Sequence, residues 1–504
     1  IKPAVDGETI VTTIDSNVQA ICEKYLKAFS DEHANEAREG LGANNIGCIV
    51  YEINTGNIVA MASYPNFDLN DPYNISAYYT EEQIAELQEE DELQDTIQRF
   101  WRNFCISDTY EPGSVIKPFT VAAALDDGSI TGNETYNCTG VREIGGHKIR
   151  CHNRYGDGII SVKGAIETSC NVALTYIAET MGPTEFCKYQ HAFNFGLRTN
   201  VDLAGEARTD SLVYTANTMG SAELATNSFG QTFNVTMIQM VAGFASLVNG
   251  GYYYEPHIVS KILNADGSVA QTISPRVLKR TISEEVSDTI IDYCNGVVEE
   301  GTGKRARPAG YKVGGKTGTA ETLPRGNGEY VVSFMGYAPA DNPQYIFYVV
   351  VDRANAKEQA DAKFATGIAR NIMTEALPYL NIFMTEELTE KEIAELEALN
   401  LSITNGYKEQ LAAANGTAEN PEGTEGESGE GENTGEGENP EENGEAGEGQ
   451  TASGETASTV NTQVWRTFEL DPATGTFIDP ETGHHIDPET GDDLDGTSTG
   501  EENP

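Results

Sequence analysis

Three short motifs carry side chains that could together perform acyl transfer through a serine nucleophile. The first is S-x-x-K, with Ser114 and Lys117 one helical turn apart after a Glu-Pro-Gly turn. Side chains with this spacing emerge on one face of a helix. A serine hydroxyl becomes nucleophilic when a neighbouring base takes its proton, and a partly buried amine can be that base. Alone the pair is a weak signal, because S-x-x-K arises by chance roughly once or twice in a chain of this length.

The second motif, S-x-N, places Ser169 and Asn171 two residues apart in "TSCNVAL", where a loop between two helices is expected. A second hydroxyl can relay protons, and a side-chain amide can hold a substrate carbonyl. Most isolated matches of this kind are helix-capping serines.

The third motif is K-T-G, at Lys316, Thr317 and Gly318 in "GGKTGTAE", on an expected strand. Lys316 and Thr317 alternate around the pleat, and Gly318 allows another group to approach the backbone closely. An isolated match could equally be edge protection of a sheet.

The elements that must position these motifs alternate between helix and strand patterns. A helix over residues 12–32, capped by Ser16 with Gln19, precedes a hairpin around "NTGN" and an acidic helical insertion at 76–100. Helices follow from Ser114 to Gly128 and over 161–181, then three strand patterns between residues 311 and 352, and a helix over 361–378. This order predicts an α+β fold whose antiparallel sheet joins strands from both ends of the chain.

Charge is distributed unevenly along the 504 residues. Residues 419–504 contain 24 of the 79 acidic residues and only one of the 32 basic residues. Such a Gly- and Glu-rich tail cannot bury enough apolar surface to fold, so we expect it to be disordered and to act as an extended spacer. Its D-P-x-T-G repeats are too short for a solenoid, and calcium binding by them is a weaker alternative. The acidity excludes nucleic acid as a partner.

The eight cysteines form no Cys-x-x-Cys pair. Cys138 and Cys151 end a hairpin-like stretch, so a disulfide between them is a hypothesis, whereas the other thiols are expected to be free or buried. His147 and His152 lie nearby, but the spacing fits no standard zinc pattern, and no metal is expected. The chain has no apolar run of eighteen residues, and it begins with Ile, which suggests a removed N-terminal part that could have carried a signal or anchor.

Together the motifs occur in the order found in active-site serine penicillin-recognising enzymes. With "NTGNIVAMASYPNFDLN", "DTYEPGSVIKPF", "SFGQTFNVTMIQM" and "FMGYAPADNPQY", they resemble the transpeptidase domain of class B penicillin-binding proteins from about residue 8 to about residue 380. The resemblance implies an antiparallel sheet of about five strands, flanking helices and an all-helical subdomain. We therefore expect a transpeptidase domain at 1–380, a short helical appendage at 381–418 and the disordered tail at 419–504.

The resemblance also implies a role for each motif residue. Ser114 would be the acylated nucleophile, Lys117 its general base, and Ser169 the proton shuttle to the leaving amine. Asn171 would hold the substrate peptide and orient Lys117, and Lys316 would supply positive potential. The substrate-binding residues would be Thr317, Gly318 and Thr319, with the terminal carboxylate bound by the two threonines and the oxyanion by the backbone N–H groups of Ser114 and Thr319.

The middle position of S-x-N is Cys170 rather than Asp. The flanking Ser and Asn carry the implied roles, and no histidine close in sequence could activate Cys170 as a nucleophile. No cofactor is implied.

The implied activity is D,D-transpeptidation of peptidoglycan stem peptides that end in D-Ala-D-Ala, with β-lactams forming a slow acyl-enzyme. The implied location is the outer face of a bacterial cell membrane, with a membrane glycosyltransferase partner engaged through an N-terminal part. Alternatives are a D,D-carboxypeptidase, a serine β-lactamase, which lacks support because no Glu-x-x-Leu-Asn motif occurs, a class A enzyme and a non-catalytic scaffold. A role in division, elongation or sporulation stays open.

Overall fold

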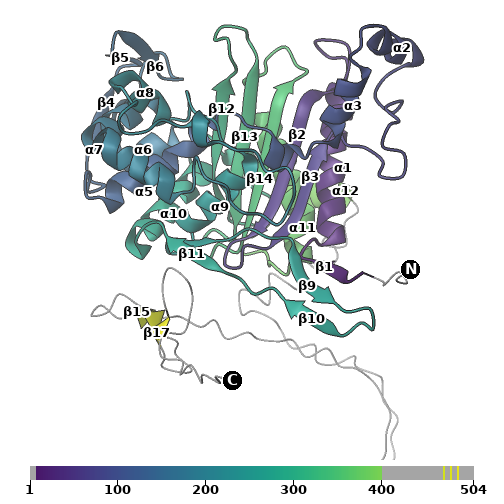
Figure 1. Ribbon diagram of the computed structural model, residues 1–504. Coiled ribbons are helices and arrows are strands. Elements are labelled where there is room, and N and C mark those ends of the chain that lie inside the picture. Colours follow the sequence, from purple (N-terminus) through teal and green to yellow (C-terminus); the bar gives the residue numbers. More distant parts are fainter. Residues whose placement is uncertain (1–6, 400–468, 471–476, 479–484, 487–504) are drawn as a thin grey trace, which may run out of the picture. The chain divides into compact units, whose positions relative to one another are not determined.

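A five-stranded antiparallel sheet forms the centre of the domain (Figure 1). The computed structural model describes residues 7–399 and the pairs 469–470, 477–478 and 485–486. The strand order is β12-β13-β14-β2-β3. The strands are β2 (Ala43–Glu52), β3 (Ile58–Tyr64), β12 (Gly314–Glu321), β13 (Tyr330–Ala338) and β14 (Tyr345–Ala354).

The sheet joins the two ends of the domain, as the sequence predicts. β2 and β3 form the hairpin expected around "NTGN", and β2 pairs with β14, so that Tyr51 lies opposite Ile346. Both faces are covered, which explains why the central strands are almost continuously apolar. The α+β fold with about five strands is confirmed.

Helices α1 (Ser16–His33) and α11 (Lys363–Tyr379) cover one face of the sheet. α1 buries an apolar stripe that includes Val18 and Leu26. Its N-cap is Asp15, whose carboxylate accepts the Asn17 and Val18 amides, so the expected cap at Ser16 is wrong by one residue. The described part of the appendage ends in α12 (Glu390–Ala398), which packs on this layer through buried Leu396.

The opposite face is covered by a larger group of helices, which carries two of the three motifs. α9 lies at its centre with every residue buried, against β2, β14 and α5. The group comprises α4 (Phe104–Ser107), the 3-10 turn η1 (Gly113–Ile116), α5 (Lys117–Asp126), α6 (Val162–Glu167), α7 (Asn171–Ala192, interrupted at Gly182), α8 (Ser221–Asn227), α9 (Met237–Leu247) and α10 (Glu284–Glu299).

This subdomain is not all-helical, which corrects the expectation. β4 (Thr135–Cys138) pairs with β7 (Gly158–Ser161), and β5 (Val141–Ile144) forms a hairpin with β6 (His147–Arg150). The hairpin falls where the sequence between Cys138 and Cys151 predicts one. Its turn residues Gly145 and Gly146 both have positive φ, a conformation that glycine adopts without strain.

The acidic insertion forms two helices, α2 (Glu81–Glu89) and α3 (Leu93–Trp101), around a separate small apolar cluster. The remaining elements are short strands and 3-10 turns. They are β1 (Thr9–Thr12), β8 (Tyr252–Tyr254), β9 (Val259–Leu263), β10 (Val269–Thr272), β11 (Val277–Arg280), η2 (Asp210–Leu212) and η3 (Lys304–Ala306).

Three short strands lie within the D-P-x-T-G repeats and belong to a second unit of the chain. β15 (Glu469–Leu470), β16 (Phe477–Ile478) and β17 (His485–Ile486) pair as an antiparallel meander. The expected disorder of residues 419–504 stays a prediction, because the rest of this tail lies outside the described residues. Within the described part, no helix is long and apolar enough to cross a membrane.

Candidate active site

The first motif is presented on η1, directly beside strand β12. Gly113 has a φ of +59° and donates its N–H to the Gly230 carbonyl at 2.9 Å. A Cβ at Gly113 would lie 2.7 Å from the Thr319 carbonyl oxygen and 3.1 Å from the Thr319 nitrogen. Only glycine fits this turn, and the turn therefore places Ser114 next to the backbone of β12.

The glycine of K-T-G permits the same close approach from the strand side. A Cβ at Gly318 would lie 2.3 Å from Ser333 Oγ and 2.7 Å from Val115 Cγ2. The predicted close approach at Gly318 is confirmed, and the approaching side chains are those of Ser333 on β13 and Val115 on η1. The first and third motifs therefore meet along one edge of the sheet.

The side chains of all three motifs converge on Ser169, in the loop between α6 and α7. Lys117 Nζ donates to the Ser169 carbonyl at 2.6 Å, to Ser169 Oγ at 3.0 Å and to Asn171 Oδ1 at 2.8 Å. Lys316 Nζ, from β12, donates to the same Ser169 Oγ at 3.0 Å. One hydroxyl therefore links both lysines, although Lys117 and Lys316 lie far apart in the sequence.

Burial alters the acidity of both amines. Lys117 and Lys316 are fully buried. Loss of hydration disfavours the charged form and lowers the pKa of Lys117 to about 8. The same cause, with the nearby charge of Lys117 second, holds the pKa of Lys316 well below its usual range. A neutral amine is consequently accessible near physiological pH, as a general base requires.

The remaining predicted residues lie around this centre. Ser114 and Thr319 are half-buried, and among the described residues the Ser114 hydroxyl forms no hydrogen bond. Asn171 Oδ1 accepts the hydrogen bond from Lys117 Nζ, while Asn171 Nδ2 donates to the Arg150 carbonyl at 3.0 Å. That amide nitrogen is thus held by the protein itself.

The sequence analysis missed Thr302, whose hydroxyl lies 2.9 Å from Thr317 Oγ1. It follows α10, and its N–H donates to the Glu167 carbonyl. No motif marks it, because only the fold brings residues 302 and 317 together.

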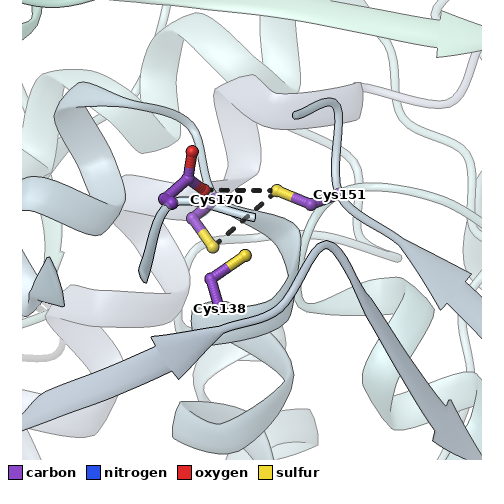
Figure 2. A group of neighbouring side chains, drawn as sticks. Cys138, Cys151 and Cys170 are labelled. Atoms are coloured by element: carbon purple, nitrogen blue, oxygen red, sulfur yellow. Dashed lines mark hydrogen bonds between the residues drawn. The ribbon is translucent and has the colours of Figure 1, made fainter. Parts of the chain in front are cut away.

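One of the two cysteine expectations is wrong, whereas the expectation that the other thiols are free or buried is confirmed. All eight cysteines are free thiols, so the Cys138–Cys151 disulfide is absent. Instead Cys151 Sγ lies 3.8 Å from Cys170 Sγ, and the Cys170 side chain caps α7 by accepting the Ala173 N–H. Its buried sulfur faces Cys138 and Cys151 (Figure 2).

A cavity of about 690 Å³ lies beyond the end of β12. It is lined by Glu111, Thr322 and residues of the α2–α3 insertion, but by none of the predicted catalytic residues. Arg325 Nη2 also donates to both carboxylate oxygens of Glu111, which ties the loop after β12 to the turn before Ser114.

The sheet, its helical layers and the meeting of the three motifs define the transpeptidase fold of penicillin-binding proteins. The chain belongs to this family, because its residues 46–374 match the penicillin-binding protein transpeptidase domain. The predicted resemblance to class B proteins is confirmed.

Curated relatives extend the same likeness. The chain is 32% identical to stage V sporulation protein D of Bacillus subtilis over 80% of its own length and 58% of that protein. It is 28% identical to the probable peptidoglycan D,D-transpeptidase PenA of Neisseria gonorrhoeae, over 77% of this chain and 60% of the relative. The chain is 28% identical to PbpB of Mycolicibacterium smegmatis, over 69% of this chain and 51% of that protein. The chain thus spans between half and three fifths of these relatives.

Solved structures share the fold. Penicillin-binding protein 3 of Mycobacterium tuberculosis, complexed with aztreonam, has a TM-score of 0.64 and 25% identity, over 77% of this chain and 83% of that chain. The D,D-transpeptidase domain of a peptidoglycan glycosyltransferase from Eggerthella lenta has a TM-score of 0.62 and 25% identity, over 75% of this chain and 84% of that chain.

The close packing at Gly318 leads to a first prediction. Gly318→Ala is expected to lower the free energy of unfolding by about 1–3 kcal/mol, because the new methyl group overlaps Ser333 and Val115. Urea unfolding midpoints measure the effect. Gly367→Ala in α11 is the matched control, since its Cβ would meet no atom within 4 Å. Equal midpoints for the two variants would show that β12 and η1 are not tightly packed at Gly318.

Proposed function

We propose that the chain is a D,D-transpeptidase that cross-links peptidoglycan stem peptides through an acyl-enzyme on Ser114. The observation that carries this proposal is the hydrogen bonding of both lysines, Lys117 and Lys316, to one hydroxyl, that of Ser169. Lys117 follows Ser114 by one helical turn, at the junction of η1 and α5. Family membership and the similarity to PenA, a probable peptidoglycan D,D-transpeptidase, support the same reaction.

In the acylation step, neutral Lys117 takes the Ser114 proton, and the Ser114 oxygen attacks the carbonyl between the last two D-alanines. The backbone N–H groups of Ser114 and Thr319 then stabilise the oxyanion. Two observations support this pair of donors: Ser114 lies in the first turn of η1, where amides lack intrahelical partners, and Thr319 N is close to Gly113. The tetrahedral intermediate collapses when the D-alanine amine receives a proton through Ser169.

Deacylation reverses the proton path. An amine of a neighbouring stem peptide loses its proton as it attacks the Ser114 ester, and the serine is regenerated. Because β12 is an edge strand of the sheet, a stem peptide can lie along it as an added strand. Its terminal carboxylate would then meet the hydroxyls of Thr317 and Thr319 and the positive potential of Lys316.

A β-lactam would acylate Ser114 by the same route and stay attached. We further propose that the protein acts on the extracytoplasmic face of the membrane. It would bind a glycosyltransferase partner through a part of the protein outside this chain. Both rest on the family alone.

The reaction can be separated from its closest alternative by product analysis. Incubation with uncross-linked glycan bearing pentapeptide stems should release D-alanine together with cross-linked dimers, both measured by liquid chromatography and mass spectrometry. Release of D-alanine with tetrapeptide monomers as the only other product would favour the carboxypeptidase. Many turnovers of β-lactam hydrolysis would favour the β-lactamase.

The acidity of Lys117 predicts a pH profile. Below its pKa of about 8 the amine is mostly protonated and cannot accept the Ser114 proton. The second-order rate constant for acylation by a fluorescent penicillin should therefore rise about tenfold per pH unit up to about pH 8 and then level off. Stopped-flow labelling measures it, with circular dichroism at each pH as the control for unfolding. A flat or falling profile below pH 8 would exclude neutral Lys117 as the base.

A further inference from the structure

Three cysteines and one aspartate gather beside the S-x-N motif. Cys138 ends β4, Cys151 follows β6, Asp157 precedes β7 and Cys170 caps α7. Their sulfur and carboxylate atoms all lie within 4.8 Å of one another. Figure 2 shows the three sulfur atoms converging from separate segments. Among the described residues, no other group of three or more His, Cys, Asp or Glu side chains converges in this way.

The distances match a tetrahedral zinc site. With Zn–S bonds of about 2.3 Å and Zn–O bonds of about 2.0–2.2 Å, two sulfur ligands are separated by about 3.8 Å, and a sulfur and an oxygen by about 3.6 Å. Cys151 Sγ lies 3.8 Å from Cys170 Sγ and 3.6 Å from Asp157 Oδ2.

The proximity of two sulfur atoms alone would not indicate a metal site, because Cys22 Sγ and Cys48 Sγ are 3.7 Å apart in the core without further ligands. The group formed by Cys138, Cys151, Cys170 and Asp157 differs from this pair by its third thiol and its carboxylate. A disulfide, with an S–S bond of about 2.05 Å, would use only two of the three sulfurs and leave the third thiol beside an aspartate.

The surroundings also suit a metal. The three cysteines are buried, whereas Asp157 is half-buried and leaves an approach for an ion. Asn153 Nδ2 donates to Asp157 Oδ1 at 3.0 Å, which turns Oδ2 towards Cys151. Outer hydrogen bonds of this kind hold ligating carboxylates in place. The Ala173 N–H donates to Cys170 Sγ at 3.4 Å and would stabilise a thiolate.

We propose that Cys138, Cys151, Cys170 and Asp157 bind one Zn²⁺, which anchors the loop that carries Ser169 and Asn171. Soft thiolates select zinc over hard cations, and four protein ligands make a closed structural site. The thiols release their protons on binding, and no redox change occurs. This proposal departs from the expectation of no metal, and its ligands are not the histidines His147 and His152.

The metal would act on the motif through Cys170, the residue between Ser169 and Asn171. Ser169 has a φ of +57°, a conformation uncommon outside glycine, so its loop needs support from its neighbours. The Asn171 side chain binds the carbonyl of Arg150, next to ligand Cys151. Zinc would therefore tie both sides of the loop to the β4–β7 segment. This effect on catalysis rests on the proposed function, but metal binding itself does not.

The test is metal content, measured first on the unmodified chain. Untagged protein made in zinc-supplemented medium and purified with reductant should contain about one zinc per chain by plasma mass spectrometry. Cobalt exchanged into the site should give thiolate-to-metal charge-transfer absorption and the strong d–d bands of tetrahedral coordination. Chelation should lower the melting temperature, and zinc should restore it.

Variants then locate the site. Cys138→Ala, Cys151→Ala and Cys170→Ala should each lose the zinc, whereas Asp157→Asn should keep the fold and bind zinc about 10–100-fold more weakly. Cys22→Ala, which also removes a fully buried thiol with a thiol neighbour, is the matched control and should keep one zinc. Chelation of the wild type should slow penicillin acylation. If it removes the zinc without slowing acylation, the anchoring role is excluded while the metal site stands.

The proposal is overturned if the reduced wild-type chain takes up neither zinc nor cobalt in equilibrium dialysis. It is also overturned if peptide mapping finds two of the three cysteines joined in a disulfide and reduction creates no metal binding. Equal metal loss in Cys22→Ala and in the cluster variants would do the same. Because metal content is measured without substrate, failure of this proposal is distinguishable from failure of the transpeptidase proposal.

Discussion

Ser114→Ala is expected to abolish covalent labelling by a fluorescent penicillin. The hydroxyl is the atom that forms the acyl bond in the proposed mechanism, and no neighbouring side chain can replace it, since the Cys170 sulfur faces Cys138 and Cys151 instead. Loss of a serine nucleophile costs at least about 10³-fold in rate. Labelling followed by denaturing electrophoresis measures this loss, and mass spectrometry of the wild-type adduct should place the modification on Ser114.

The fold should survive this change, because among the described residues the Ser114 hydroxyl forms no hydrogen bond. Urea unfolding of Ser114→Ala should therefore match the wild type within about 0.5 kcal/mol. Ser76→Ala, at an exposed serine outside the site, is the matched control and should label normally. Undiminished labelling of Ser114→Ala would refute the nucleophile assignment.

The second large effect is expected for Lys117→Ala. Removing a positioned general base typically slows a reaction by about 10²–10⁴-fold. The change also leaves the Ser169 carbonyl and Asn171 Oδ1 without the donor that they share. Single-turnover acylation rates should fall by this factor, and the rise of the rate up to about pH 8 should disappear.

Two controls separate catalysis from structure in this variant. Lys261→Ala removes an exposed lysine and should leave the acylation rate unchanged. Small primary amines added to Lys117→Ala should partly restore the rate, because they can occupy the vacated space and accept the proton. A rate within about twofold of the wild type would mean that another group activates Ser114.

The sequence alone specified the sheet and the three motifs. Strand patterns at residues 47–64 and 311–352 were readable because strands covered on both faces are continuously apolar. The order of S-x-x-K, S-x-N and K-T-G indicated the family before any coordinates, since each motif is local in sequence.

Local sequence patterns gave wrong predictions where contacts between distant segments determine the structure. The subdomain was expected to be all-helical, but β4 and β7 pair across the intervening hairpin. The N-cap of α1 is Asp15 rather than the predicted Ser16, because a side chain of either type can accept hydrogen bonds from the first free amides of a helix.

Only the tertiary structure showed how the motifs act on one another. The shared hydrogen bonds of Lys117 and Lys316 at Ser169 join residues from three separate segments, and the depressed pKa of each lysine depends on burial that sequence spacing does not encode. The same holds for Cys138, Cys151, Cys170 and Asp157. Metal-ligand motifs are recognisable in a sequence when ligands are close neighbours in the chain, whereas here folding brings together ligands from four elements.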